Sequence, residues 1–274
     1  MTNELVSIIM LSRNNGKYVE ETVRSVFAQT YQNWEIVFRD DSSKDDTISQ
    51  IMNLVSESRI KREDGSYVNR IHVSQTVTKR GTARSTNSAL KEVRGRWIAF
   101  LNVGSVWEPT KLEKQIAFME ENGYAFSYTK YGLINEKSED KGVVYSGLKH
   151  ITYKDMLKCC WPGCLTVMYD SEKIGKMQIR NLHENNDYAL WLNICEKADC
   201  YLLNENLARQ RATRNIFLLF LFSNQLKWRY RCYRIEEDLN PFVSLLYSFR
   251  NGFYGIWKKI KYVERGKYGN TIDK

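Results

Sequence analysis

The stretch from Val6 to Thr47 places the strongest constraint on the fold of this chain. It opens with a short apolar run rich in β-branched residues, Val6–Met10, which predicts a buried strand. Apolar residues at helical spacing follow, and a second strand is predicted at 34–38. A strand, a helix and a strand in this order predict a parallel, right-handed βαβ unit. Ligands of open α/β sheets bind beyond the carboxyl ends of the strands, so Leu11–Arg13 and Asp40–Ser43 are expected to face one crevice.

The composition restricts the class of protein. With 274 residues, of which 43% are hydrophobic and 27% charged, the chain suits one large globular domain or one domain with an appendage. A formal net charge of +9 favours an anionic partner or surface. No nucleic-acid recognition motif accompanies the basic residues, so nucleic acid is not an expected partner. The six cysteines lack the spacing of a zinc site and are expected to be reduced and buried.

Later segments bring further polar residues to the same edge of the predicted sheet. Arg84 lies in the first turn of a predicted helix, where backbone N–H groups and a guanidinium both attract anions. A predicted central strand ends in Asn102-Val103-Gly104, and a helix with an apolar face begins near Asp187. From the residues alone, Arg84 equally fits a surface ion pair, Asp187 a helix N-cap, and Asp40-Asp41 a solvated turn or cap.

The opening stretch resembles the start of the family 2 nucleotide-sugar glycosyltransferases of bacterial surface-polysaccharide synthesis. Members of that family read close to VSIIxPxYN…SVxxQTYxxxExIxxDDxSxDxT. A later D-Y-x-L-W-L box begins at Asp187, and the closing LAxYR box is similar to L-A-R-Q-R at 207–211. The positions that fit the opening pattern are Val6–Met10, Asn14, Ser25-Val26, Gln29-Thr30-Tyr31, Glu35, Asp40-Asp41, Ser43, Asp45 and Thr47.

The resemblance implies a fold and an organisation for the chain. The fold class is α/β, with a GT-A, Rossmann-like mixed sheet flanked by helices over residues 1–214. A helical segment rich in basic and aromatic residues is expected to follow at 215–274.

The resemblance also implies an activity. The chain is expected to be an inverting glycosyltransferase of the hexosyltransferase type, which uses a nucleotide-diphosphate sugar, with a UDP-sugar favoured. The expected acceptor is a saccharide, including one linked to polyprenyl diphosphate. In the family the second acid of the Asp40-Asp41 pair binds uracil, so Asp41 is the expected base contact, and Asp187 is the expected general base. The other expected donor-binding residues are Leu11, Arg13, Asp40, Arg84, Asn102 and Gly104.

The chain departs from the family where a metal is expected. A DxD motif there holds Mg²⁺ or Mn²⁺ on the diphosphate, but Asn102-Val103-Gly104 stands in its place, and Ser105 follows where a further Asp is usual. Asn102 offers one carbonyl oxygen as a metal ligand. Donor handling is therefore either lost, which predicts a catalytically impaired relative that binds glycan, nucleotide or a partner enzyme, or taken over by arginines. The candidate arginines are Arg13, Arg39 and Arg84.

The C-terminal segment, residues 215–274, alternates basic and aromatic residues, as in Lys227–Arg234. Such helices suit the interface of an anionic membrane, and the alternative is a pair of helices packed on the core with a basic outer face. The apolar run at 216–222 is far shorter than the roughly 20 residues of a spanning helix, and no signal peptide opens the chain. We expect a cytoplasmic protein, which in the first case is peripheral on the cytoplasmic face of the inner membrane.

Overall fold

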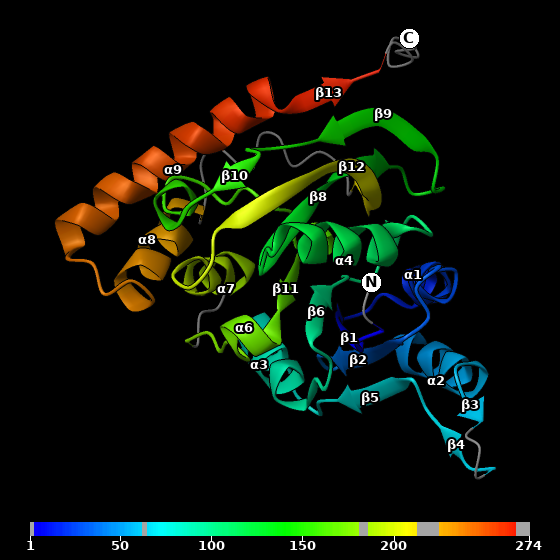
Figure 1. Cartoon of the computed structure of the whole chain (residues 1–274). Helices are drawn as coiled ribbons and strands as arrows, with labels where there is room; N and C mark the ends of the chain where they lie inside the picture. Colours follow the sequence, from blue (N-terminus) through cyan, green and yellow to red (C-terminus); the bar gives the residue numbers. More distant parts are fainter. Residues whose placement is uncertain (1–2, 62–64, 181–185, 213–224, 267–274) are drawn as a thin grey trace, which may run out of the picture.

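A mixed sheet forms the centre of the protein (Figure 1). The computed structural model describes residues 3–61, 65–180, 186–212 and 225–266. The main strands in this part of the chain are β1 (Val6–Ser12), β2 (Trp34–Asp40), β5 (Ile71–Gln75), β6 (Trp97–Phe100), β8 (Phe126–Ile134), β10 (His150–Ile151), β11 (Met168–Asp170) and β12 (Cys200–Arg211). They lie in the order β10-β12-β8-β11-β6-β1-β2-β5. The predicted α/β class, with a mixed sheet flanked by helices, is confirmed.

The predicted βαβ unit is present at the N-terminus. β1 pairs in parallel with β2 on one side and with β6 on the other, and α1 (Gly16–Phe27) connects β1 to β2. Hydrogen bonds join the loops that follow the two strands. The backbone N–H of Asp41 donates to the carbonyl of Ser12 (2.9 Å), and that of Asn14 donates to Oγ of Ser43 (2.8 Å). The two loops therefore lie side by side at the carboxyl edge of the sheet, and the crevice that they were expected to share stays a prediction.

Helices cover both faces of the sheet, each over its own apolar core (Figure 1). Side chains of a strand alternate between its faces, so Ile8 and Met10 of β1 belong to one core and Ile9 to the other. The helices over the first core are α1, α2 (Thr47–Glu57) and α4 (Lys111–Asn122), and those over the second are α3 (Thr82–Glu92), α5 (Tyr153–Met156), α6 (Ser171–Ile174) and α7 (Asn186–Cys195).

Shorter elements extend the sheet or stand beside it. β7 pairs with β12, β9 with β8, and β13 with β9, while β3 and β4 form a separate two-stranded sheet. A 3-10 turn, η1, precedes β11. Their bounds are β3 (Ile60–Lys61), β4 (Tyr67–Val68), β7 (Val106–Trp107), β9 (Asp140–Tyr145), η1 (Cys164–Thr166) and β13 (Val263–Arg265).

The C-terminal helices α8 (Gln225–Ile235) and α9 (Pro241–Lys261) pack on the second core. The hydroxyl of Tyr233 on α8 lies 2.9 Å from that of Tyr188 on α7, and both tyrosines are buried. Nδ2 of Asn251 on α9 donates to both hydroxyls. One face of each helix therefore packs on the core, as the alternative of packed helices predicted.

Other expectations for this region have mixed outcomes. The apolar run at 216–222 lies outside the described residues, and the division of the chain at residue 214 stays a prediction. Among the helices that the structure describes, none is long and apolar enough to cross a membrane. The six cysteines are free thiols, of which four are buried; they are Cys159, Cys160, Cys164, Cys195, Cys200 and Cys232.

Candidate functional site

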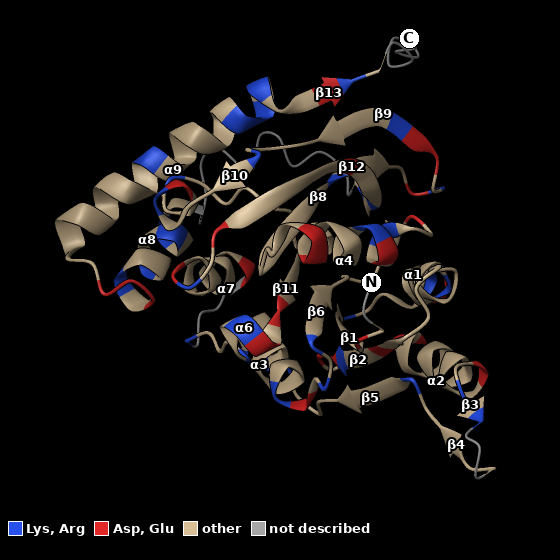
Figure 2. Ribbon diagram, viewed as in Figure 1, with Lys and Arg blue, Asp and Glu red and all other residues tan. Residues whose placement is uncertain are grey.

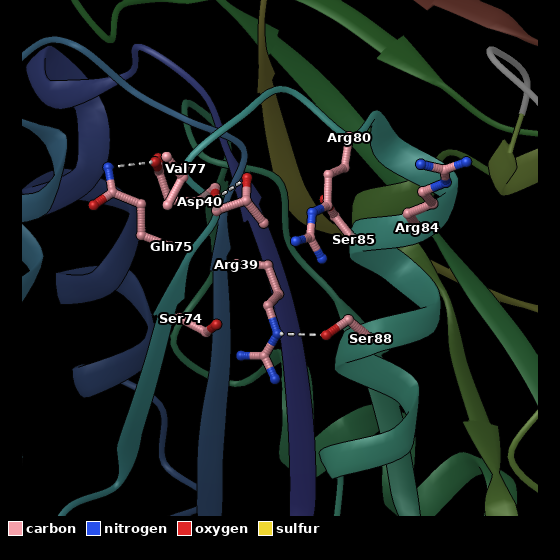
Figure 3. A pocket seen from close by; sticks show the side chains of 10 residues that line it. Arg39, Asp40, Ser74, Gln75, Val77, Arg80, Arg84, Ser85 and Ser88 are labelled. Atoms are coloured by element: carbon pink, nitrogen blue, oxygen red, sulfur yellow. Dashed lines mark hydrogen bonds between the residues drawn. The ribbon is translucent and has the colours of Figure 1, made fainter.

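A pocket of about 300 Å³ opens between the ends of β2 and β5 and the start of α3 (Figure 3). Its chemical character is set by three arginines, which come from β2, from the loop before α3 and from the first turn of α3. In Figure 3 the Arg80 side chain points into the pocket, whereas the guanidinium of Arg84 points away from it. The lining residues are Arg39, Asp40, Ser74, Gln75, Thr76, Val77, Arg80, Arg84, Ser85 and Ser88.

Arg39 is turned under α3 and neutralised there. Its side chain is 4% exposed, and its Nη2 lies 2.5 Å from Oε1 of Glu92 in an ion pair. Its Nη1 donates to the Phe38 carbonyl (3.0 Å). A guanidinium that is already paired with a carboxylate has little charge to offer a second anion. The structure therefore argues against Arg39 as a replacement for the metal.

Asp41 holds the loop that leads into α3. Its buried carboxylate accepts hydrogen bonds from the backbone N–H groups of Arg80 (2.7 Å) and Gly81 (3.1 Å). Each carboxylate oxygen can accept more than one hydrogen bond, so the N3–H of a uracil can still be accommodated. The sequence predicted the uracil contact, which stays a prediction, but not this second task.

Asp40 has a structural task in the turn after β2. Its carboxylate accepts from the backbone N–H of Ser43 (2.7 Å) and from Nε2 of Gln75 on β5 (3.2 Å). Asp40 is buried and lines the pocket, but these bonds occupy much of its accepting capacity. Its predicted part in donor binding is untested.

The remaining candidates near the crevice differ in exposure. Leu11 is partly buried against the second core, at the end of β1. Arg13, two residues further on, and Arg84 on α3 are both exposed. Long, exposed cations beside the carboxyl edge of the sheet are free to adjust to a phosphate group. Of the three arginines considered from the sequence, Arg13 and Arg84 fit that task best.

The loop after β6 has a geometry that explains its glycine. Gly104 has φ of 98°, a conformation that side chains other than glycine rarely adopt. Its backbone N–H donates to Oγ1 of Thr22 on α1 (2.9 Å), and the N–H of Ser105 donates to the carbonyl of Asn102 (3.1 Å). The loop is therefore a tight turn tied to α1, with the Asn102 side chain exposed.

The residues at this turn do not form a donor set for Mg²⁺ or Mn²⁺. These ions prefer several oxygen ligands, with carboxylates among them, whereas the turn offers the amide oxygen of Asn102 and the hydroxyl of Ser105. In the described ranges, no three His, Cys, Asp or Glu side chains lie together in a way that could hold a metal ion. No step of a reaction is therefore assigned here to a metal ion.

Asp187 lies in the first turn of α7 beside the same turn. It is partly buried, and the Cys164 side chain of η1 hydrogen bonds with its carboxylate and with the Asn102 side chain. Burial raises the pKa of Asp187, and the hydrogen bond from the Cys164 thiol offsets part of that rise. The fold thus brings Asp187 and Asn102, which are predicted from separate motifs, to the two sides of one thiol.

A carboxylate in this setting is suited to accept a proton. A general base works best when its pKa lies near the working pH, and desolvation moves an aspartate in that direction. The carboxylate lies near Asn102, which follows β6 at the carboxyl edge of the sheet. The arrangement can therefore deprotonate a hydroxyl group brought to Asp187 while a ligand with phosphate groups lies over the strand ends.

Three residues of this region were not predicted from the sequence. Cys164 was expected only as a buried structural thiol, and neither Thr22 nor Arg80 was singled out as a site residue. Each acts through a partner far away in the chain, so no local pattern reveals it. A cysteine or threonine in an apolar stretch is more often a packing residue.

Comparisons with known proteins agree with these features. A model described as glycosyl transferase family 2 matches residues 7–179. The putative teichuronic acid biosynthesis glycosyltransferase TuaG of Bacillus subtilis is 38% identical over 220 residues, which are 78% of this chain and 82% of TuaG. WfgD of Escherichia coli, named UDP-Glc:alpha-D-GlcNAc-diphosphoundecaprenol beta-1,3-glucosyltransferase, is 33% identical over 271 residues, 97% of this chain and 100% of WfgD.

The fold is also similar to that of solved structures. S. aureus TarS in complex with UDP-GlcNAc has a TM-score of 0.67 at 17% sequence identity, with 93% of this chain and 76% of the TarS chain covered. This likeness concerns the fold.

Proposed function

The chain belongs to glycosyl transferase family 2, and we propose that it moves a sugar from a UDP-sugar to a saccharide acceptor linked to polyprenyl diphosphate, in surface-polysaccharide synthesis. The chain is a glycosyltransferase with a GT-A-type fold, as its sequence predicted. The observation that carries the finer proposal is the placement of Asp187 beside Asn102, which follows β6 at the carboxyl edge of the sheet. The name of WfgD and the UDP-GlcNAc bound to TarS support the donor and acceptor classes.

The proposed reaction is a single displacement with inversion. Asp187 accepts the proton of the acceptor hydroxyl, whose oxygen forms a bond to the anomeric carbon of the donor sugar. The bond from that carbon to the diphosphate oxygen breaks, and its electron pair leaves with UDP. The nucleotide keeps the negative charge and Asp187 keeps the proton until it is released to water.

The leaving diphosphate needs positive charge as its bond breaks. Arg13 and Arg84 are exposed cations at the end of β1 and the start of α3. Guanidinium groups can bind phosphate oxygens in pairs, and the start of a helix also favours anions. We therefore assign to these two arginines the neutralisation that a metal ion performs in similar enzymes.

The donor is tested by calorimetric titration with UDP, CDP and GDP, followed by a transfer assay. We expect UDP to bind most tightly, and a UDP-sugar to glycosylate a GlcNAc-diphosphate-lipid acceptor. Transfer from GDP-sugars alone would contradict the proposed donor.

If Asp41 accepts the N3–H of uracil, Asp41→Asn should lower the preference for UDP over CDP by about tenfold, since cytosine has no N3–H and an amide can serve either base.

Because Asp41 also holds the loop before α3, the variant needs a control for its structural task. Asp40→Asn removes a neighbouring buried carboxylate from the same turn without the expected base contact. Both variants should weaken the binding of all nucleotides to some extent. Only Asp41→Asn should change the ratio of the dissociation constants of UDP and CDP. The same ratio in both variants would show that Asp41 does not contact the base.

The Cys164 thiol is expected to set the pH at which Asp187 works. Cys164→Ala removes the hydrogen bond that lowers the pKa of Asp187, so its pKa should rise and the acidic limb of the kcat/KM profile should move to higher pH. Cys164→Ser keeps a donor and should stay closer to the parent profile. The measurement is the rate of transfer between about pH 5 and 9. Equal profiles for Ala and Ser would show that the thiol acts only by filling space.

A further inference from the structure

The outermost helix of the protein exposes its phenylalanine, leucine and isoleucine side chains, while Tyr247, Tyr254 and Trp257 pack against the second core. α9 runs along the edge of the molecule (Figure 1), and its buried residues are polar: Ser244, Ser248 and Asn251. A surface helix of a water-soluble protein normally has the reverse arrangement. The exposed apolar side chains, here called the α9 stripe, are Phe242, Leu245, Leu246, Phe249, Phe253, Ile256 and Ile260.

Hydrogen bonds fix the polar face of α9 against the protein. Nδ2 of Asn251 donates to the hydroxyls of Tyr188 (3.1 Å) and Tyr233 (3.0 Å), which are both buried. A rotation of the helix that buried the stripe would break these buried bonds and leave polar groups unpaired. The outward direction of the stripe is therefore a consequence of how α9 packs.

Positive charge surrounds the stripe. α8 and α9 together contain eight Lys and Arg residues and no Asp or Glu (Figure 2). These two helices therefore supply much of the positive charge of a chain whose formal net charge is +9. Of the acids that flank α9, Asp238 forms an ion pair with Arg180 (3.0 Å) and Glu264 forms one with Lys130 (2.9 Å), whereas Glu236 and Glu237, between α8 and α9, are partly buried. The surface is thus both apolar and cationic.

The structure assigns the α9 stripe as a membrane-docking surface that enters the boundary between headgroups and acyl chains of an anionic bilayer. Such a bilayer offers apolar chains to the stripe and negative headgroups to the cations around it. A second copy of the chain fits less well, because two α8–α9 surfaces would bring like charges together.

The docking surface is joined to the candidate site by one loop. Nζ of Lys258 on α9 donates to the carbonyls of Cys160 (3.1 Å) and Trp161 (2.5 Å). The same loop continues to Cys164, which contacts Asp187. A docked α9 would thus hold the base close to the bilayer that carries a lipid-linked acceptor, and this part of the inference rests on the proposed function.

Vesicle flotation tests the surface. The intact chain should bind vesicles of phosphatidylglycerol and phosphatidylcholine at about 0.1 M NaCl and less at about 0.5 M, since salt screens exposed charges. Phe249→Gln with Phe253→Gln should lower binding by at least about tenfold, because each phenylalanine loses apolar burial in the bilayer. The matched control, Met52→Gln with Tyr67→Gln, removes exposed apolar residues from α2 and β4 and should change nothing.

Each of the following outcomes would overturn the inference. An intact chain that ignores the vesicles at low salt has no docking surface. A lower melting temperature of the double variant without vesicles means that another part of the chain covers the stripe. A dimer that the variant turns into a monomer, measured by light scattering, means that a second copy does. Vesicle binding is measured without sugar transfer, so a failure of the proposed enzyme activity would leave this result intact.

Discussion

Asp187→Asn is expected to lower kcat by about 10²- to 10⁴-fold while the dissociation constant of UDP changes by less than about twofold. The amide cannot accept the proton of the acceptor hydroxyl, but it keeps the size of the side chain and its place beside Cys164. A general base acts in the chemical step and does not hold the donor. Single-turnover transfer and calorimetric UDP titration measure the two quantities. A variant that keeps its turnover would assign the proton transfer to another group.

Thermal stability separates this loss from unfolding. Because burial raises the pKa of Asp187 in the folded state, the unfolded chain releases this proton more readily, and the charged carboxylate costs stability at neutral pH. The neutral amide removes that cost. Asp187→Asn should therefore melt at the same or a higher temperature than the parent at pH 7–8, and the difference should vanish as the pH falls below about 4, where the unfolded carboxyl is also protonated. A lower melting temperature at neutral pH would show that the amide disturbs the site.

The fold was predictable because its signals are local. The β-branched run Val6–Met10, the helical spacing after it and the acidic turn at 40–43 each report on a few neighbouring residues, and the structure places them as expected. The candidate site was predictable only in part. Arg39 lines the pocket, as its place beside the crevice predicted, but its guanidinium pairs with Glu92 of α3, a distant partner that no local pattern reveals.

Contacts between distant segments were beyond reach of the sequence. Cys164 and Asp187 lie in different elements, and only packing brings the thiol to the carboxylate. The same limit applies to α9. Its apolar spacing was visible in the sequence, but which face packs on the protein is decided by Asn251 and its tyrosine partners on α7 and α8. The sequence therefore allowed both packed helices and a membrane surface, and α9 has features of both.

Transfer by the parent enzyme is expected to continue in EDTA, with UDP affinity in Mn²⁺ and in EDTA equal within about twofold, because the turn at 102–105 provides no carboxylate for a metal ion. Arg13→Gln with Arg84→Gln should weaken the binding of UDP by about tenfold or more and the binding of uridine much less, since uridine has no diphosphate to lose its cationic partners. Lys91→Gln, which removes an exposed cation from the last turn of α3, is the matched control.

Carboxylates placed at the turn give the opposite test. Asn102→Asp with Gly104→Asp should make UDP binding stronger in Mn²⁺ than in EDTA, but position 104 has φ of 98°, so the second substitution strains the backbone by about 1–3 kcal/mol and should lower the melting temperature by at least about 2 °C. Asn102→Asp alone adds one ligand without that strain and separates the two effects. Transfer by the double variant in Mn²⁺, with none by the parent under any condition, would mark the chain as an impaired relative. The other outcome is that the parent transfers sugar in EDTA and that Arg13→Gln with Arg84→Gln lowers this transfer. It would mean that the two guanidinium groups hold the diphosphate, because the departure of UDP then depends on their charge.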